Sequence, residues 1–334
     1  MAELKDIKGT NIQNVDGNPS NPIEGQLWYN SSTGNRVAKG EIFAAAAWAT
    51  GGALNNGRAT MGSFGTQTAS VVGGGEGPGP FSPQGNGAEE YNGTSWSTTS
   101  NIPVAKREMA GGAGTESAGL ICGGFSYPPF SIKTGTEEYD GSSWTSGGAL
   151  SSGYRGKMCL GQAQTAALAY GGNSPTTPVQ TGSEEYNGSS WTSGGTMSDG
   201  RENAGGSGTQ TSGLAFGGNP SSPGPGTKTE EYDGTSWTSG GALNTGRHGV
   251  RGGTQGTQTA AIAMGAPAPS SSNTELYDGT SWTTSTNLST ARDSGGGGGT
   301  QTSAIFSGGS PSPVGTSTEE FTNAGNKTIT IDVD

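Results

Sequence analysis

The sequence is poor in the residues that many enzymes and metal proteins use. It has one histidine, His248, which stands beside Arg247 with no pattern of acid and nucleophile around it. A histidine-based triad would have to use this residue, and a site with several histidine ligands is excluded within one chain. We therefore predict no catalytic residues, no metal site, no cofactor and no enzymatic activity.

Cysteine, long apolar runs and positive charge are also scarce. Cys122 and Cys159 stand near apolar positions and are expected to be buried free thiols, although the pattern also permits a disulfide. No apolar run approaches the roughly 20 residues of a membrane helix, and the N-terminus has no signal-peptide core, so we expect folding in a cytoplasm. With 16 basic and 27 acidic residues, the chain is not expected to bind nucleic acid or an anionic membrane.

What the chain has instead is glycine and a repeat. Glycine supplies 65 of 334 residues, and six tryptophans recur at intervals of 45 to 48 residues. They are Trp48, Trp96, Trp144, Trp191, Trp237 and Trp282. A period of this length is typical of solenoids, propellers and arrays, in which each thin unit buries its apolar face against its neighbours. We therefore expect these tryptophans to pack between units.

Each unit reads as four short antiparallel strands, which we name A to D. An Asn-Gly or Asp-Gly pair before the tryptophan, such as the pair at 140–141, predicts a two-residue hairpin between strands C and D. A turn spelled Gly-Thr-Gln-Thr, as at 65–68, separates strand A from strand B, which ends in a glycine pair. Four antiparallel strands in about 45 residues make a propeller blade.

The order glycine pair, Glu-Glu-Tyr, tryptophan, arginine resembles the kelch repeat over residues 41–320. The resemblance implies an all-β, six-bladed kelch-like β-propeller. The chain begins with C–D material and ends with A–B–C, so we expect the strand around Trp48 to complete the last blade and remove open sheet edges. The alternating tail at 327–333 competes for that outer position. We assign residues 1–40 to an N-terminal segment and 41–334 to the propeller.

The loops between strands B and C differ in length and sequence and are rich in proline. Variable loops on a rigid scaffold commonly form a binding surface, and proline lowers the entropy lost when a loop is ordered. The aromatic candidates for receptor binding on these loops are Phe81, Tyr127 and Phe130. The alternative is that the loops are a surface without a binding role.

An arginine follows each tryptophan by 10 or 11 residues, in the connection between strands D and A on the same face. These residues are Arg58, Arg107, Arg155, Arg201, Arg247 and Arg292. One interpretation is a basic ring that binds an anionic group such as an acidic sugar. Its receptor contacts would include Arg107, Arg155, Arg201 and Arg247. The other interpretation is that each arginine pairs with a glutamate of the repeat. Those glutamates are adjacent on a strand and point to opposite sides, which does not suit a glycosidase pair. Two glutamates from different blades could still converge, and the sequence leaves that alternative open.

Residues 1–40 contain a stretch rich in proline and asparagine, followed by a predicted hairpin. A lone hairpin is marginally stable, so we expect Leu27, Trp28 and Tyr29 to dock onto another protein. The phrase Gly-Gln-Leu-Trp-Tyr-Asn-Ser-Ser-Thr-Gly resembles a short module near the start of tail-fibre and other virion proteins of phages, particularly marine ones. That resemblance implies a virion protein assembled in the host cytoplasm, with other virion proteins as partners of residues 1–40.

These features lead to one main hypothesis and two alternatives. The main hypothesis is a phage virion protein, a tail fibre or appendage, whose propeller binds a glycan or protein of the host surface. The alternatives are a head or tail decoration protein with a purely structural role and a cellular kelch-type protein-interaction module. Neither nucleic-acid binding nor membrane insertion is expected, and the sequence leaves a homo-oligomer open.

Overall fold

The computed structural model describes residues 13–15, 27–32, 35–38, 46–77, 85–174, 176, 179–220, 226–266, 272–310 and 315–323. The chain divides into two compact units. The larger unit is Ala47–Thr322, and the smaller one combines Met1–Ala46 with Asn323–Asp334.

The smaller unit contains a three-stranded sheet. Strand β2 (Leu27–Asn30) pairs with β3 (Asn35–Ala38) as an antiparallel hairpin, and β1 (Gln13–Val15) lies parallel to β2. The backbone hairpin expected near residue 30 is thus present. The side chains of Leu27, Trp28 and Tyr29 lie outside the described part of the chain, so their docking role stays a prediction.

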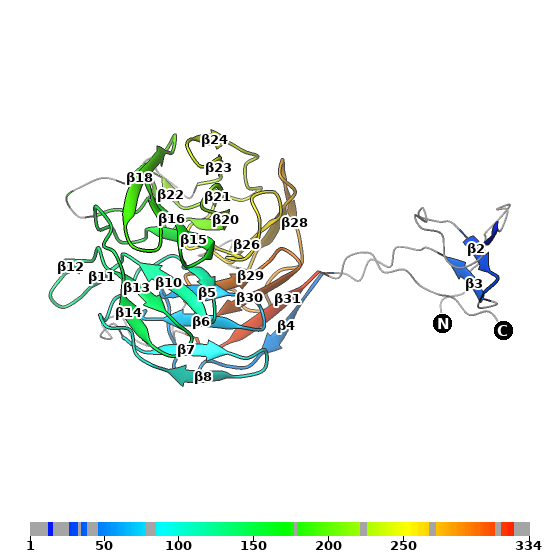
Figure 1. Ribbon diagram of the computed structural model, residues 1–334, viewed down its shortest axis with the longest axis horizontal. Helices are drawn as coiled ribbons and strands as arrows, with labels where there is room; N and C mark the ends of the chain where they lie inside the picture. The colour runs from blue at the N-terminus through cyan, green and yellow to red at the C-terminus, as the bar shows by residue number, and fades with distance from the viewer. Residues whose placement is uncertain are drawn as a thin grey trace. The chain divides into compact units, whose positions relative to one another are not determined.

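The larger unit is built on six four-stranded antiparallel sheets, each with its strands in the order A, B, C, D (Figure 1). It also has two small two-stranded sheets, β11 (Phe125–Ser126) with β12 (Ser131–Ile132) and β19 (Arg201–Glu202) with β22 (Asn219–Pro220). Blade 1 is β5 (Gly62–Gly65), β6 (Ser70–Gly73), β7 (Ala88–Tyr91) and β8 (Trp96–Thr99). Blade 2 is β9 (Ala113–Thr115), β10 (Ala118–Cys122), β13 (Thr136–Tyr139) and β14 (Trp144–Ser146). Blade 3 is β15 (Met158–Ala163), β16 (Ala166–Tyr170), β17 (Gly182–Tyr186) and β18 (Trp191–Thr196).

The other three blades repeat this order. Blade 4 is β20 (Gly205–Thr209), β21 (Ser212–Phe216), β23 (Thr229–Tyr232) and β24 (Trp237–Ser239). Blade 5 is β25 (Arg251–Gly252), β26 (Ala261–Met264), β27 (Thr274–Tyr277) and β28 (Trp282–Thr284). Blade 6 is β29 (Gly296–Gly299), β30 (Ser303–Ser307), β31 (Thr318–Thr322) and β4 (Ala47–Gly51).

Blade 6 therefore joins the two ends of the propeller. Strand β4, which carries Trp48, forms its outer strand and pairs with β31 so that Trp48 lies opposite Phe321. The alternating tail at 327–333 lies outside the described residues. The prediction of an all-β, six-bladed propeller is confirmed, and the described residues contain no α-helix. Accordingly, no helix in this part of the chain is long and apolar enough to cross a membrane.

The innermost strands are rich in glycine because they approach one another closely. A Cβ atom on Gly252 of blade 5 would lie 1.9 Å from the carbonyl oxygen of Gly206 in blade 4. No side chain fits at such a distance. The core lies between the sheets, where Cys122 and Cys159 share one apolar cluster as buried free thiols.

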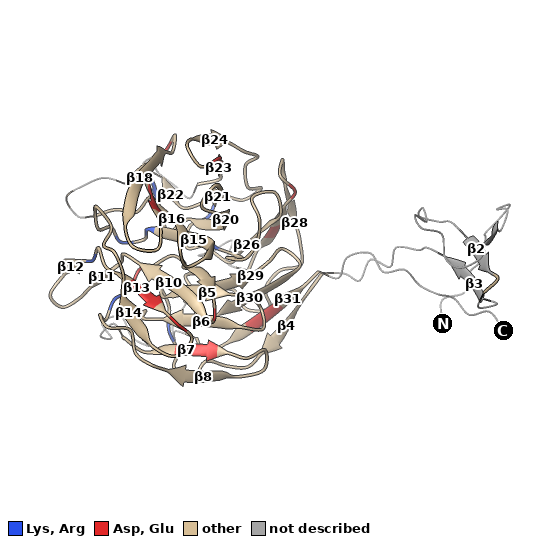
Figure 2. Cartoon of the chain, in the orientation of Figure 1, with Lys and Arg blue, Asp and Glu red and all other residues tan. Residues whose placement is uncertain are grey.

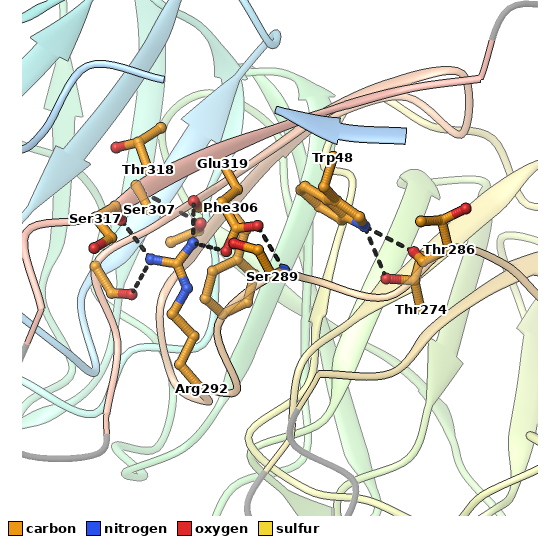
Figure 3. A network of polar contacts seen from close by, with 12 residues as sticks. Trp48, Thr274, Thr286, Ser289, Arg292, Phe306, Ser307, Ser317, Thr318 and Glu319 are labelled. Carbon is orange, nitrogen blue, oxygen red and sulfur yellow. Dashed lines mark hydrogen bonds and ion pairs between the residues drawn. The ribbon is translucent and has the colours of Figure 1, made fainter. Parts of the chain in front are cut away.

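The tryptophans lie between neighbouring blades. Each described indole other than that of Trp144 donates its Nε1–H to a hydroxyl at the start of strand C in the preceding blade. These bonds are Trp48 to Thr274 (3.1 Å), Trp96 to Thr318 (2.9 Å), Trp191 to Thr136 (2.8 Å), Trp237 to Ser183 (3.3 Å) and Trp282 to Thr229 (2.9 Å). Figure 3 shows the first of these bonds, between Trp48 and Thr274.

A second bond between blades joins the tyrosine of strand C to the second glutamate of the preceding blade. The bonds are Tyr91 to Glu320, Tyr139 to Glu90, Tyr186 to Glu138, Tyr232 to Glu185 and Tyr277 to Glu231. Burial, together with the bond to the glutamate, raises the pKa of Tyr91 to about 12. At the sixth junction the positions are occupied by Phe321 and Leu276, so the hydroxyl and the carboxylate are lost together.

At the junction between blades 1 and 2, the tryptophan donor is present but its hydroxyl acceptor is missing. The indole nitrogen of Trp144 is buried and has no partner in the described part of the chain, because Ala88 stands where the other blades have Thr or Ser. A buried donor without an acceptor is destabilising by about 1–3 kcal/mol.

We predict that Ala88→Thr stabilises the protein by about 1 kcal/mol, since it supplies the missing acceptor. Urea unfolding followed by tryptophan fluorescence measures the change. The control is Ala88→Thr in a Trp144→Phe background, where there is no indole N–H. An equal gain in both backgrounds would contradict the proposed bond.

Candidate functional site

The basic residues that follow the tryptophans form buried ion pairs in every blade. The pairs are Arg58–Glu89 (2.7 Å), Lys106–Glu137, Lys157–Glu184 (2.6 Å), Arg201–Glu230, Arg247–Glu275 (2.9 Å) and Arg292–Glu319 (2.9 Å). The glutamate is the first of each pair on strand C, and Figure 2 shows acidic residues on β7 and β13. Each pair ties a D–A connection to strand C of the next blade.

The arginine of blade 6 shows how such a charge is accommodated (Figure 3). Arg292 donates to the Glu319 carboxylate and to the backbone carbonyls of Gly308 and Ser317, at 3.2 and 2.5 Å. Glu319 also accepts the backbone N–H of Ser289 at 2.8 Å. Both charges are therefore paired and hydrogen-bonded, as burial of a charge requires.

This arrangement corrects the interpretation of an open basic ring. Arg201 and Arg247, two of the predicted receptor contacts, are 2% and 1% exposed and belong to ion pairs. Burial lowers the pKa of Arg247 to about 10, against the opposing effect of Glu275. These two guanidinium groups bind the protein's own carboxylates and are not available to a ligand.

The two remaining candidates, Arg107 and Arg155, occupy a different position. They follow their tryptophans by 11 residues, whereas the buried residues in five blades follow by 10. The tenth position holds Lys106 in blade 2 and Tyr154 in blade 3. The one-residue difference in spacing was visible in the sequence, and it separates the partly buried arginines, Arg107 and Arg155, from the fully buried ones.

The twelfth position after each tryptophan forms a ring around the propeller axis, which we call the axial ring. Its members are Thr60, Glu108, Gly156, Asn203, Gly249 and Ser294. All six have φ between +51° and +62°, the left-handed region that residues other than glycine rarely adopt. Backbone strain of this kind is concentrated at functional sites.

Backbone hydrogen bonds connect the axial ring from blade to blade. The bonds run from the N–H of Thr60 to Ser294 (2.7 Å), Ser294 to Gly249 (2.9 Å), Gly249 to Asn203 (2.9 Å), Asn203 to Gly156 (2.9 Å) and Gly156 to Glu108 (2.8 Å). The N–H of Met109 closes the circle on the carbonyl of Thr60 at 3.1 Å. This closed circle holds the side chains around it in fixed positions.

Five charged side chains gather beside this ring, and we call them the axial cluster: Glu76, Arg107, Glu108, Arg155 and Glu202. Arg107 forms an ion pair with Glu76, and the Nε of Arg155 lies 3.9 Å from the Glu108 carboxylate. Burial raises the pKa of Glu108, with Glu202 and Glu76 acting in the same direction and Arg155 and Arg107 opposing it.

Buried polar atoms without a protein partner also occur here. Among the described residues they include Thr60 Oγ1, Arg107 Nε and His248 Nδ1, all in D–A connections within one residue of the axial ring. Native proteins leave few such atoms unpaired, and water or a ligand usually supplies the missing bond. The axial region is therefore able to accept hydrogen bonds from, and donate them to, a bound molecule.

An aromatic hairpin adjoins the axial cluster. Strands β11 (Phe125–Ser126) and β12 (Ser131–Ile132) form it within the B–C loop of blade 2. The rings of Phe125 and Phe130 are 5.1 Å apart, and the Arg107 guanidinium lies 4.8 Å from the centre of the Phe125 ring. Phe81 lies outside the described residues, so its role stays a prediction.

The tip of this hairpin is unusually exposed. Tyr127 and Phe130 are 44% and 43% exposed, and Val104, in the same connection as Arg107, is 40% exposed. These three are the exposed large apolar side chains of the described part of the chain. Tyr127, Phe130 and Arg107, which were predicted separately, therefore belong to one surface. We call the hairpin and the axial cluster together the blade 2 face.

These features define the protein as a six-bladed β-propeller with a mixed polar and aromatic face. No protein-family model matches the sequence, and no curated protein matches it. By contrast, 239 chains of solved structures match its fold. One of them, described as "Structure of YjhT", is 12% identical with a TM-score of 0.62, over 84% of this chain and 96% of that chain.

The YjhT match shows a shared fold. It does not extend to the kelch repeat itself or to a phage origin, which stay resemblances. It does correct the prediction that the chain has no enzymatic activity. That prediction rested on the scarcity of histidine and on the opposed directions of the paired glutamates, whereas a shared scaffold takes its chemistry from the side chains of its sites. A carboxyl group with a raised pKa, such as Glu108, is a kind of group that transfers protons in enzymes. The exclusion of catalysis is therefore not retained.

The described residues contain no group of three or more His, Cys, Asp or Glu side chains placed to hold a metal ion. The axial cluster instead sets two guanidinium groups among three carboxylates. Their arrangement suits a ligand that forms many hydrogen bonds.

We predict that Glu108→Gln changes how stability depends on pH. The pKa of Glu108 is raised in the folded state, so its protonated carboxyl group contributes to folding stability. This contribution is fully present below the ordinary pKa of about 4.5 and is lost as the pH rises through the folded pKa. The variant should therefore gain stability relative to the wild type as the pH rises from 4.5. Urea unfolding over a pH series measures this.

Asp140→Asn is the matched control, since bonds from Ser143 and Ser142 hold the pKa of Asp140 below its usual range. The contribution of Asp140 is present above its ordinary pKa and is lost in acid, so its pH dependence has the opposite sign. Parallel pH profiles for the two variants would contradict the assignment of Glu108.

Proposed function

We propose that this chain is a phage virion protein whose propeller binds a glycan of the host surface through the blade 2 face. The observation that carries the proposal is the exposed aromatic pair Tyr127 and Phe130 beside the charged axial cluster. Exposed aromatic side chains on a rigid loop mark binding surfaces, because they give large contact areas at low entropic cost.

The chemistry of the blade 2 face favours a sugar over a flat apolar partner. A sugar ring has an apolar C–H face and a rim of hydroxyls that both donate and accept hydrogen bonds. The aromatic rings can pack against the C–H face, while the carboxylates and guanidinium groups of the axial cluster can form hydrogen bonds with the hydroxyls. The unpaired atom Arg107 Nε adds further hydrogen-bonding capacity at the same place.

The virion assignment is supported by the resemblance of residues 25–34 to the phage module. In this proposal residues 1–40 attach the chain to other virion proteins, and the propeller presents its loops outward. The blade-to-blade bonds of tyrosine and tryptophan give the scaffold the rigidity that a loop-borne site needs.

We predict that Tyr127→Ser with Phe130→Ser weakens binding of the full chain to susceptible cells about tenfold or more, since truncation of aromatic anchors has effects of this size. Flow cytometry with fluorescently labelled protein measures the change. The control is Ser97→Ala with Thr98→Ala, two exposed positions on the outer strand of blade 1. Unchanged binding by the hairpin variant would show that the blade 2 face is not the receptor site.

Electron microscopy of the intact particle, with a gold label on the propeller, tests the virion assignment. Label at the distal end of the tail is the expected result. Label spread over the head or along the tail tube would contradict the receptor role and support a decoration protein. Particles without any label would contradict the virion assignment.

A further inference from the structure

Blade 3 differs from the other blades at the residue that follows its tryptophan by ten. Tyr154 occupies this position, whereas the other five blades have Arg or Lys. The buried carboxylate of Glu184 instead accepts from Lys157, three residues further on, at 2.6 Å. Blade 3 thus keeps a buried ion pair, but its cation is Lys157 and not the residue ten positions after the tryptophan. At that position the ring of Tyr154 takes the place of an Arg or Lys side chain.

A hollow of about 210 Å³ opens at this place. Its walls include Tyr154, Lys157, Glu184, Ser183 and Gln180, and its rim includes Ser193. Lys157 and Glu184 are almost completely buried, and the Lys157 ammonium lies 5.4 Å from the centre of the Tyr154 ring. The floor therefore combines a paired charge with an aromatic wall.

We infer that this hollow is a subsite for a single neutral sugar residue. The inference rests on the proposed glycan binding for its choice of ligand, and it adds a second contact at a different blade. The Glu184 carboxylate already accepts from Lys157 and from the backbone N–H of Ser151. An ammonium has three donors and a carboxylate about four lone-pair sites, so the pair that lines the hollow keeps the capacity to donate to one sugar hydroxyl and accept from its neighbour. Because the two charges compensate each other, the hollow has no preference for an ionic ligand.

The tyrosine ring completes the match. A sugar that presents its hydroxyls to Lys157 and Glu184 can place its C–H face against an aromatic wall. The equivalent hollow of blade 1 has Arg58 in place of the ring, and its guanidinium is already bonded to Glu89 and to the carbonyls of Gly74 and Gly87. Blade 3 thus differs from blade 1 by the features that a sugar would use.

The test is saturation-transfer NMR on the full chain with the methyl glycosides of glucose, galactose, mannose and N-acetylglucosamine. At least one glycoside should receive saturation from the wild type and from Tyr154→Phe, which keeps the ring. The signal should be lost in Tyr154→Arg with Lys157→Met. This double variant gives blade 3 the residues that blade 1 has at Arg58 and Met61, so its buried carboxylate keeps a cation.

Ser193→Trp is a second variant, which obstructs the hollow from its exposed rim without altering the ion pair. It too should lose the signal, so the result does not depend on how well the double variant folds. No signal with any glycoside on the wild type would overturn the subsite. A signal that persists in both variants would also overturn it, because the sugar would then lie elsewhere.

The cell-binding experiment separates the two proposals. Wild-type protein that binds the glycosides in this hollow but does not bind cells would support the subsite and contradict the proposed receptor function. Protein that binds cells through the hairpin but binds none of the glycosides would support the receptor function and contradict the subsite.

Discussion

The buried ion pair in each blade is the interaction on which the binding face depends. It fastens the D–A connection to strand C, at a point two residues before the axial ring in most blades. A buried charge pair is stable only when its remaining hydrogen-bonding groups are satisfied. In Arg292 the carbonyls of Gly308 and Ser317 accept from one terminal nitrogen of the guanidinium, while its Nε has no partner among the described residues. The glycine pair, the arginine and the first glutamate of the repeat are therefore parts of one structure.

The repeat tolerates loss of a polar bond when both partners change together. Where Phe321 has no hydroxyl, the facing position is Leu276 and no polar group is left alone. Where Ala88 replaces a threonine, Trp144 keeps an indole nitrogen that has no partner among the described residues. In blade 3, Tyr154 stands where the other blades have an Arg or Lys, and Lys157 provides the cation that pairs with Glu184. The first and third cases follow the rule that buried polar groups are paired, and Trp144 is an exception to it.

Much of this fold could be predicted from the sequence because the tryptophan period and the turn residues each point to the same four-stranded unit. The exposed pair Tyr127 and Phe130 could also be located, since both stand in a loop outside the repeat. The axial cluster could not. Its geometry depends on a left-handed conformation at the twelfth position, which has no residue signature, as Glu108 and Asn203 show. Arg201 and Arg247 were grouped with Arg107 and Arg155 because spacings of 10 and 11 residues were treated as one position, although the first two are fully buried and the last two only partly.

The pairing of β4 with β31 determines how the propeller responds to tension. Ala47, where the chain enters, lies opposite Thr322, where it leaves, and Gly51 lies opposite Thr318. A pulling force applied between these two ends would separate the strands from the Ala47 end, so the five residue pairs would break one after another and not together. Such a force therefore acts directly on the pairing of β4 with β31, where the ring is joined to the rest of the chain. An attachment that carries load has to hold both ends together or keep one of them free of tension.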